Sequence, residues 1–285
     1  MIITEINGGL GNQLFQYAAG LALSKKHNTP LKINTNFNSL DTNRKLALTH
    51  FNIDVNQADQ SEINHLYPSS SLNRKIQSIL PTSRKSFYKE QKFSFQSNFS
   101  QLSSSVYLKG YWQSEMYFSS INQLIKEKYI LDSACYKNAS DFIHQLSSHE
   151  SVSIHVRKGD YLKAPYNAYY AELNNEYYKR AIGFLKEICP ALKVYVFTDD
   201  PSWVEQHLDL GLPFELASGH KTNSMFEDFQ AMRSCKYHVI ANSSFSWWTA
   251  WLSAHPDKIV VAPSNWFKNS QQDTVDLIPK SWNIL

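Results

Sequence analysis

The sequence predicts an α/β fold built on parallel sheets, and two observations carry this prediction. In the second half of the chain, short apolar runs of the strand type alternate with segments of helical spacing. In the first half, an apolar strand passes through a glycine-rich turn into a long helix and then into another strand. Such alternation is typical of parallel strands joined by right-handed crossovers. We expect two such halves, domains 1–150 and 151–285, to meet near residue 150 and leave a cleft.

The composition fits this architecture and excludes one class of function. A length of 285 residues allows two domains of ordinary size, and a hydrophobic share of 42% is enough for sizeable cores. A net charge of +3 is too weak for a dedicated nucleic-acid binder, so no nucleic-acid partner is expected. Aromatic residues make up 14%, which suits clefts for sugars or bases as well as plain core packing.

The first half begins with a strand over residues 1–6, a turn at 7–11 and a helix. The helix is predicted from apolar residues that recur with helical spacing, namely Leu14, Tyr17, Ala18, Leu21 and Ala22. Asn28 is expected to end it, because Pro30 lies just beyond. Strands are predicted at 31–33 and 106–108, whereas the polar region 36–105 between them shows no clear periodicity.

The second half opens with the strand 151–157, in which apolar and polar residues alternate. That period of two predicts one buried face. The remaining predicted elements are a helix at 175–188, a buried strand at 194–197, a helix capped by Asp200 with Pro201 at its first position, a helix opened by a capping box at 224–227 that turns Met225, Phe229 and Met232 inward, a strand at 237–241, a helix at 247–252 and a strand at 258–262.

The end of the strand 151–157 is the first candidate site. His155 and Arg157 are two residues apart, so they leave the same face about 7 Å apart along the strand. Gly159 then breaks the strand, and Lys158 and Asp160 adjoin it. Open α/β folds bind ligands at such strand ends, and an arginine fork fits a phosphate. We therefore predict an anionic, phosphorylated ligand. A surface salt bridge between Arg157 and Asp160 is the alternative.

The glycine-rich turn before the first helix is the second candidate. Glycines between a strand and a helix allow close approach of the backbone to a ligand, and a helix N-terminus favours negative charge. Gly11, Asn12 and Gln13 lie at this point. The segment is neither a Walker loop nor a dinucleotide fingerprint, because Leu14 stands where the third glycine of the latter belongs. A tight structural turn remains the alternative.

A hydroxyl-rich turn between the strand 237–241 and the next helix is the third candidate. Its polar residues are Asn242, Ser243, Ser244 and Ser246, with Asp228 upstream on the preceding helix. Hydroxyls and unsatisfied backbone N–H groups at a helix start can hold a diphosphate without a metal. An ordinary N-cap is the alternative, although a cap needs only one hydroxyl.

Other patterns argue against a metal or disulfide framework. Asp199 and Asp200 are adjacent carboxylates, but a helix cap explains Asp200 better than a metal does. The three cysteines are far apart and have no ligand spacing, which predicts reduced thiols. We predict no required metal and no cofactor.

A basic segment over 74–92 contains six cations and one acid, Glu90. Two interpretations stay open: a solvated surface, or peripheral contact with an anionic membrane. The start of the chain does not resemble a signal peptide, and no apolar stretch approaches 18 residues. We expect a cytoplasmic protein, with peripheral association at the inner membrane as the open variant.

Taken together, these segments resemble the bacterial α-1,2-fucosyltransferases, glycosyltransferase family eleven. The resemblance rests on Gly8–Tyr17, Gly110–Glu115, His155–Tyr161, Phe197–Asp200 and Ala241–Trp248, in order along nearly the whole chain. It implies a fold of the GT-B type, with two facing Rossmann-like domains, an N-terminal acceptor side and a C-terminal GDP-sugar side.

The resemblance also implies a reaction. It is the inverting, metal-independent transfer of fucose from GDP-β-L-fucose to the 2-hydroxyl of a terminal β-galactoside, on an oligosaccharide or lipid-linked glycan of the bacterial surface such as O-antigen. Arg157 matches the arginine on the donor's β-phosphate. His155 and Asp228 match residues that face guanosine, Ser243 and Ser244 match diphosphate-holding hydroxyls, and Asn12 matches an asparagine near the reacting sugar. The family's second arginine is Lys158 here, which keeps the charge but loses the fork.

Two other functions compete with this interpretation. A non-catalytic glycan- or nucleotide-binding module fits the aromatic content, but it has little use for a diphosphate cradle. A nucleotide-dependent oxidoreductase with a Rossmann half is disfavoured because the third glycine is missing after Gly11.

Overall fold

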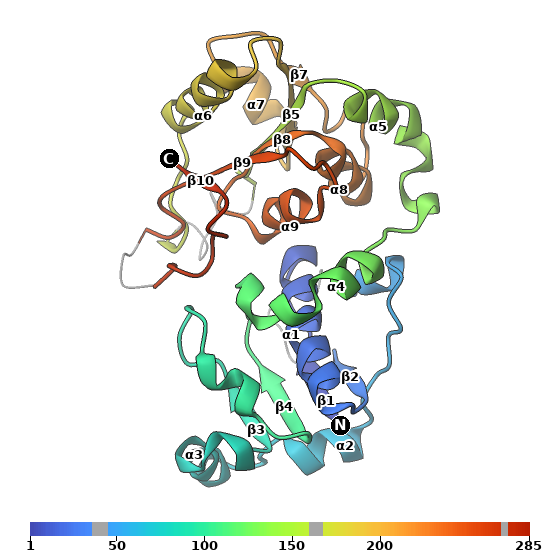
Figure 1. Ribbon diagram of the computed structural model, residues 1–285, viewed down its shortest axis with the longest axis vertical. Coiled ribbons are helices and arrows are strands. Elements are labelled where there is room, and N and C mark those ends of the chain that lie inside the picture. The colour runs from blue at the N-terminus through green and yellow to red at the C-terminus, as the bar shows by residue number, and fades with distance from the viewer. Residues whose placement is uncertain (36–44, 160–167, 269–272) are drawn as a thin grey trace. The chain divides into compact units, whose positions relative to one another are not determined.

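The computed structural model describes residues 1–35, 45–159, 168–268 and 273–285, which form two compact α/β units (Figure 1). Unit 1 comprises Met1–Ile130 with Asp273–Pro279, and unit 2 comprises Leu131–Gln272 with Lys280–Leu285. The division therefore falls 20 residues before the expected boundary at 150. Hydrophobic packing explains the difference, because Phe142 and Leu146 are buried against Tyr195 and Phe197 of unit 2.

Unit 1 is built on a parallel sheet of four strands in the order β2-β1-β4-β3. Its strands are β1 (Ile2–Glu5), β2 (Leu31–Asn34), β3 (Phe87–Lys89) and β4 (Val106–Lys109). Its α-helices are α1 (Leu10–His27), α2 (Gln60–Leu66), α3 (Ser71–Ile79) and α4 (Asn122–Lys128). The three strands predicted here are confirmed, whereas β3, α2 and α3 lie in the region whose sequence shows no clear periodicity.

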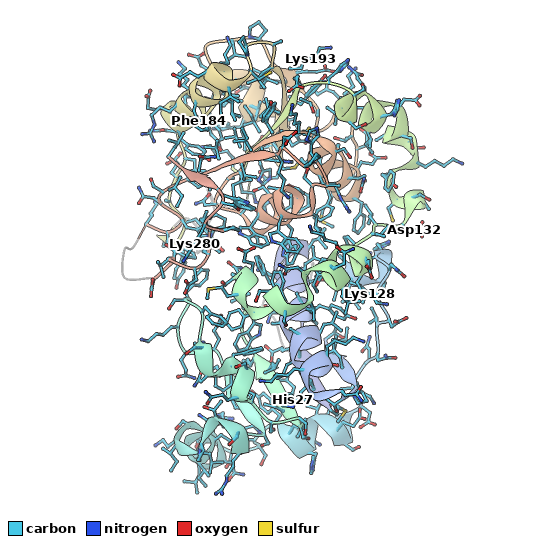
Figure 2. All side chains as sticks on the ribbon, viewed as in Figure 1. His27, Lys128, Asp132, Phe184, Lys193 and Lys280 are labelled. Carbon is cyan, nitrogen blue, oxygen red and sulfur yellow. The ribbon has the colours of Figure 1, made fainter. Side chains whose placement is uncertain are left out.

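The helix α1 follows β1 as predicted and is buried over most of its length. It ends at Asn28, whose φ of 48° is the left-handed conformation that closes many helices. His27, labelled in Figure 2, lies in its last turn, and the ring forms a hydrogen bond with the carbonyl oxygen of Leu102 at 2.8 Å. The Tyr129 hydroxyl donates to the carbonyl oxygen of Leu14 at 2.6 Å. These contacts fasten α1 to the segments before β4 and after α4, and the Thr4 hydroxyl of β1 donates to the carbonyl oxygen of Gln16 in α1 at 3.2 Å.

Unit 2 is built on a parallel sheet of six strands in the order β10-β9-β8-β5-β6-β7. Its strands are β5 (Ser151–Val156), β6 (Lys193–Thr198), β7 (Glu215–Leu216), β8 (Tyr237–Val239), β9 (Ile259–Ala262) and β10 (Asn283–Ile284). If the strands are renumbered from β5 as strand 1, the order read from β7 to β10 is 3-2-1-4-5-6. This is the arrangement of doubly wound nucleotide-binding folds. The strand order reverses between β5 and β8.

The helices of unit 2 are α5 (Ser140–Ser147), α6 (Asn175–Ile188), α7 (Pro201–His207), α8 (Met225–Ser234) and α9 (Ser244–Leu252). Asp200 caps α7 by accepting from the Trp203 N–H, as predicted. Ser224 caps α8, but the Glu227 carboxylate reaches the N–H of Asn223 instead of closing a capping box. The inward turn of Met225 was also wrong, since this residue is 43% exposed.

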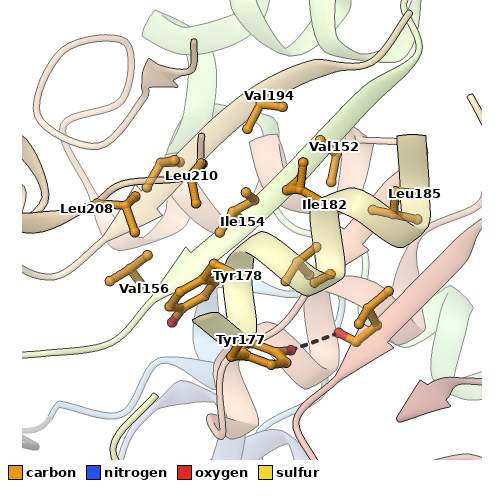
Figure 3. Packing of buried hydrophobic residues seen from close by; sticks show 14 of the residues in the cluster. Val152, Ile154, Val156, Tyr177, Tyr178, Ile182, Leu185, Val194, Leu208 and Leu210 are labelled. Carbon is orange, nitrogen blue, oxygen red and sulfur yellow. Dashed lines mark hydrogen bonds between the residues drawn. The ribbon is translucent and has the colours of Figure 1, made fainter. Parts of the chain in front are cut away.

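The predicted half-buried character of β5 was wrong, because all six of its residues are buried. Val152, Ile154 and Val156 pack against α6 on one face (Figure 3). The other face carries Ser151, Ser153 and His155, and helices α5, α8 and α9 belong to that side. A central parallel strand is covered on both sides, so polar residues on its second face lie in the interior.

No helix within 1–35, 45–159, 168–268 and 273–285 combines the length and the hydropathy that crossing a bilayer needs.

Candidate functional site

The candidate site lies where the chain leaves two neighbouring strands of unit 2. After β5 the chain continues to its neighbour β6, towards one edge of the sheet. After β8 it continues to its neighbour β9, towards the opposite edge. Such a topological switch point is where open α/β sheets bind ligands. Arg157 follows β5, and the turn 241–246 follows β8. The fold therefore brings together two segments that the sequence marked out separately.

His155 is the buried member of the first candidate site. The residue is only 4% exposed, and its ring centre lies 5.7 Å from the ring centre of Phe245 in the first turn of α9. Burial and the neighbouring Arg157 lower the pKa of His155 to about 3. The imidazole is therefore neutral near pH 7. Its Nδ1 has no hydrogen-bond partner among the described residues, which leaves a buried polar atom unsatisfied.

Arg157 is held by a carboxylate that the sequence did not assign to it. Its Nε lies 3.1 Å from Oδ2 of Asp199, and Oδ1 of Asp199 accepts from the backbone N–H of Lys158 at 2.9 Å. Burial alone raises the pKa of Asp199, but Arg157 and the N–H groups of Lys158 and Gly159 outweigh it and lower the pKa. Asp199 is thus a fixed anion that orients the guanidinium. The alternative partner, Asp160, lies outside the described residues.

Lys158 points to the other face of the sheet. Its ammonium lies 3.1 Å from Oε1 of Glu172, 3.2 Å from the carbonyl oxygen of Leu173 and 4.2 Å from the centre of the Trp203 ring. The residue is 3% exposed. Because side chains alternate along a strand, Lys158 shares the face of Val156 rather than that of Arg157. The structure therefore does not bring Lys158 to the side where His155 and Arg157 lie, in contrast to the prediction.

The hydroxyl-rich turn divides into structural and outward parts. Asn242 donates to the carbonyl oxygens of Ala171 at 2.8 Å and Trp266 at 2.9 Å. Ser246 is fully buried and donates to a carbonyl oxygen in its own turn, that of Ser243, at 3.2 Å. Both predicted ligand-binding residues therefore shape the turn in this structure.

Ser243 and Ser244 form the start of α9. Ser243 is the N-cap, and its hydroxyl accepts from the Phe245 N–H at 3.3 Å. Ser244 is the first residue of the helix and is partly exposed. The N–H groups of a first helical turn have no partner within the helix, and the macrodipole favours an anion beside them. This turn, adjoining His155 through Phe245, is suited to a phosphate group.

Asp228 reaches the same end of the sheet from α8. Its two carboxylate oxygens accept from the hydroxyls of Ser218, at 2.9 Å, and Thr222. The Ser218 hydroxyl in turn accepts from the N–H of Thr198, the last residue of β6. Burial raises the pKa of Asp228 to about 6, although the two hydroxyls oppose this shift. Next to Asp228, Phe229 lies 5.5 Å from Phe245 between ring centres, so α8 and α9 converge here.

The glycine-rich turn occupies the corresponding edge of unit 1. Gly11, Asn12 and Gln13 lie in the first turn of α1, whose N-cap Gly9 offers no side chain. Asn12 Oδ1 accepts from Gln113 Nε2 at 2.7 Å, which links the loop after β1 to the loop after β4. These strands are neighbours, so the two loops meet at the carboxyl edge of the first sheet.

Gln13 serves the fold rather than a ligand. The residue is 3% exposed, and its amide group contacts the backbone of Gly8, Lys45 and Ala47. These three bonds use both ends of the amide and fasten the start of the segment after the undescribed residues 36–44. The structure therefore places Gln13 in a structural role, unlike Asn12.

Sequence reasoning missed two carboxylates with evident roles. One is Asp199, which was considered only as a metal ligand. In the parallel pair of β5 and β6, His155 lies opposite Phe197, so Arg157 lies opposite Asp199 just beyond the paired residues. This pairing of the two predicted strands was the signal that could have revealed the contact. The other is Glu90, whose carboxylate accepts from the N–H groups of Tyr111 at 2.7 Å and Trp112 at 3.1 Å. No local pattern reveals that contact.

A metal centre finds no support in the described part of the chain, where no three His, Cys, Asp or Glu side chains gather with ligand geometry. Asp199 and Asp200 are engaged separately, in the Arg157 pair and the α7 cap. Independence from a metal stays a prediction.

Comparison with known proteins identifies the family. The family model of Glycosyl transferase family 11 matches residues 1–285. The chain belongs to glycosyltransferase family 11. This glycosyltransferase is 31% identical to an alpha-1,2-colitosyltransferase of Escherichia coli, over 99% of the chain and 98% of the relative. It is 28% identical to the O-antigen biosynthesis glycosyltransferase WbnK of Escherichia coli, over 97% and 98% of the two chains.

Solved structures agree with the fold of this glycosyltransferase. NodZ alpha-1,6-fucosyltransferase soaked with GDP-fucose gives a TM-score of 0.53 at 15% identity, over 88% of this chain and 91% of that one. POFUT1 in complex with GDP-fucose gives 0.52 at 12% identity, over 92% and 97%. The predicted fold class, α/β with two Rossmann-like domains of the GT-B type, is confirmed.

Proposed function

We propose that this family 11 glycosyltransferase transfers L-fucose from GDP-β-L-fucose to the 2-hydroxyl of a terminal β-galactoside, with inversion and without a metal. The observation that carries the proposal is Arg157, fixed by Asp199 at the switch point of unit 2, beside a neutral buried histidine and the start of α9. The relatives' names, one an α-1,2-transferase and one in O-antigen biosynthesis, support the linkage and a surface-glycan acceptor.

Stabilisation of the leaving group is the central chemical task. In a single inverting displacement, the bond from the sugar's anomeric carbon to the diphosphate breaks as the acceptor oxygen attacks, and negative charge grows on the β-phosphate. A fixed guanidinium and helix N–H groups oppose that charge without rearranging. Arg157 and the turn at Ser243 and Ser244 supply these groups in the proposed complex. Lys158 contributes indirectly, by anchoring the strand end through Glu172 and Trp203.

The guanosine end is assigned to His155 and Asp228. His155 is neutral, so its ring can accept or donate one hydrogen bond without adding charge. Asp228 has a pKa of about 6 and is mostly ionised at pH 7.5, which suits it to accept from guanine N–H groups. The hydroxyls of Ser218 and Thr222 hold the carboxylate in place for that contact.

Unit 1 is proposed as the acceptor side. Asn12 lies at the carboxyl edge of its sheet, linked to Gln113, and Tyr111 on the loop after β4 is 44% exposed. An exposed aromatic ring at a strand end is suited to stack on a sugar. The Glu90 carboxylate fixes the backbone of this loop, where Trp112 adopts a positive φ of 57°. The proton of the attacking hydroxyl passes either to a phosphate oxygen of the departing GDP or to Asp160, the candidate base from the sequence, which lies outside the described residues.

A donor-by-acceptor assay tests the proposal directly. Purified protein is mixed with GDP-fucose and a panel of galactosides, with EDTA present, and GDP release and product linkage are measured. We expect GDP release only with a β-galactoside, and a product linked α-1,2. GDP binding without turnover on every acceptor would favour a binding module, and NAD(P) binding would favour an oxidoreductase.

Transfer of colitose is the second candidate, because the more similar of the two relatives above is a colitosyltransferase. Colitose is fucose without its 3-hydroxyl group. Including GDP-colitose in the same assay separates the two: a donor site that hydrogen-bonds the 3-hydroxyl rejects colitose strongly, whereas an apolar wall there discriminates weakly. A higher kcat/KM with GDP-colitose would replace fucose as the proposed donor while leaving the role of Arg157 intact.

A further inference from the structure

The helix α3 of unit 1 carries an apolar stripe that faces solvent. Leu72, Ile76 and Ile79 follow helical spacing, so they lie on one side of the helix. They are 66%, 44% and 82% exposed, and no residue of the helix is buried. Three large apolar side chains in one exposed row are unusual on a folded surface and mark a face that another body covers.

The helix is attached by its opposite side. The Gln77 side-chain oxygen accepts from the N–H groups of Ser86 at 3.0 Å and Phe87 at 3.3 Å, where β3 begins. Figure 1 shows α3 lying beside β3. Ser70 caps the helix by accepting from the Asn73 N–H. The stripe is thus held outward by specific contacts to the edge of the sheet.

The segment that contains the stripe is strongly cationic. No Asp or Glu occurs in the sequence between Glu62 and Glu90, whereas this span contains Arg74, Lys75, Arg84, Lys85 and Lys89. Among the described residues, no carboxylate forms an ion pair with any of these five cations. The positive potential of this surface is therefore not neutralised by the protein itself.

Two structural details strengthen that potential. The Glu90 carboxylate, the nearest acid in sequence, is turned inward to the N–H groups of Tyr111 and Trp112, so it does not offset the surface cations. Behind α3 lies a cavity of about 300 Å³ whose lining includes Arg74, Lys85 and Lys89 and no carboxylate. The cationic character thus extends from the helix surface into its attachment to β3.

We propose that α3 and these five cations dock the protein on a bilayer that contains anionic lipid headgroups. An amphipathic helix with an apolar row and basic flanks lies in the plane of an interface, with the apolar row at the boundary of headgroups and acyl chains. Basic residues nearby gain energy from the negative surface potential. Nucleic acid would satisfy the cations but not the apolar stripe. The proposal does not depend on which sugar is transferred.

Vesicle sedimentation with the full chain tests the apolar part. We expect binding to phosphatidylcholine vesicles that contain phosphatidylglycerol and much weaker binding to pure phosphatidylcholine. The variant L72S/I76S/I79S should lower the partition coefficient at least about tenfold, because three apolar side chains leave the interface. The matched control is I130S/I188S/I284S, which removes three side chains that are 54%, 48% and 56% exposed elsewhere. Thermal melting of both variants verifies that they fold.

Charge replacement tests the second part. The variant R74Q/K75Q should weaken binding about 10- to 30-fold, since each cation near an anionic surface contributes on the order of 1 kcal/mol. The control K137Q/K186Q removes two exposed cations of unit 2 and should bind as the wild type does. Raising the salt to about 0.5 M should also release the protein.

Three outcomes would overturn the proposal. One is equal binding to neutral and anionic vesicles, and another is wild-type binding by a folded stripe variant. The third is a dimer in solution that L72S/I76S/I79S dissolves, which would assign the stripe to a second copy of the chain. Failure of the transfer assay would leave this inference standing, because sedimentation needs no sugar nucleotide.

Discussion

Replacement of Arg157 is the sharpest test of the proposed site. The guanidinium is 23% exposed and its Nε is held 3.1 Å from Asp199. Removing one preorganised donor from a developing anion typically costs 10²- to 10³-fold in rate, about 3 to 4 kcal/mol. We therefore expect Arg157→Ala to lower kcat/KM by at least about 100-fold. Arg157→Lys keeps the charge but loses the two-point fork, so its loss should be smaller, about 10- to 100-fold.

Stability must be separated from chemistry in this experiment. Arg157→Ala leaves the Asp199 carboxylate, 22% exposed, without its cation, so the variant also loses folding free energy. The double variant R157A/D199N removes that uncompensated charge and should recover much of the melting temperature. It should not recover kcat/KM.

The assay is GDP release with GDP-fucose and with GDP-colitose, run beside thermal melting. If folded Arg157→Ala turns over within about threefold of the wild type with the better donor, the guanidinium does not stabilise the leaving group. If R157A/D199N regains turnover along with stability, Arg157 acts on folding alone. Either result refutes the reasoning.

Three further predictions follow from single contacts. Gly159→Ala should lower kcat/KM at least about tenfold, because a Cβ there would meet Oδ2 of Asp199 at 2.7 Å and displace the carboxylate from Arg157. The matched control is Gly183→Ala, whose Cβ would meet nothing within 4 Å, and it should leave kcat/KM unchanged. Tyr111→Ala should raise the KM for the acceptor several-fold and leave the Kd for GDP, measured by calorimetry, unaltered. A change in GDP affinity alone would contradict stacking of Tyr111 on the acceptor sugar. Burial raises the pKa of Glu90 to about 7, so the folded state binds more protons than the unfolded state between about pH 4.5 and 7. The wild type should therefore lose stability as the pH rises through this range, and Glu90→Gln should flatten the plot of melting temperature against pH. Equal slopes for wild type and variant would contradict this assignment.

The family assignment changes how the remaining differences are understood. The second arginine that the resemblance implies is a lysine here, and the structure turns Lys158 toward Glu172 and Trp203 on the far face. In this structure Lys158 anchors the strand end and does not face the side on which Arg157 lies. Binding of the phosphate in the proposed complex then depends on Arg157 and the start of α9.

Much of the fold was predictable because its signals are local. Alternation of strands and helices, the Asp200 cap and the end of the first helix at Asn28 each depend on a few consecutive residues, and the structure confirms them. The region 36–105 was not predictable, because short helices and an edge strand such as β3 have too few residues to show a period. The single buried face expected for β5 was wrong for a tertiary reason, its central place between β6 and β8.

The sequence by itself determined the parallel α/β class, the residues at the strand ends and the resemblance to a transferase family, since each is written in contiguous stretches. Only the tertiary structure decided which of these residues act together. It paired Arg157 with Asp199, turned Lys158 away, and used Gln13, Asn242 and Ser246 to hold the backbone. The physical reason is that side-chain direction at a strand end and the partners across a sheet depend on register and layer packing, which bring together residues that are distant along the chain.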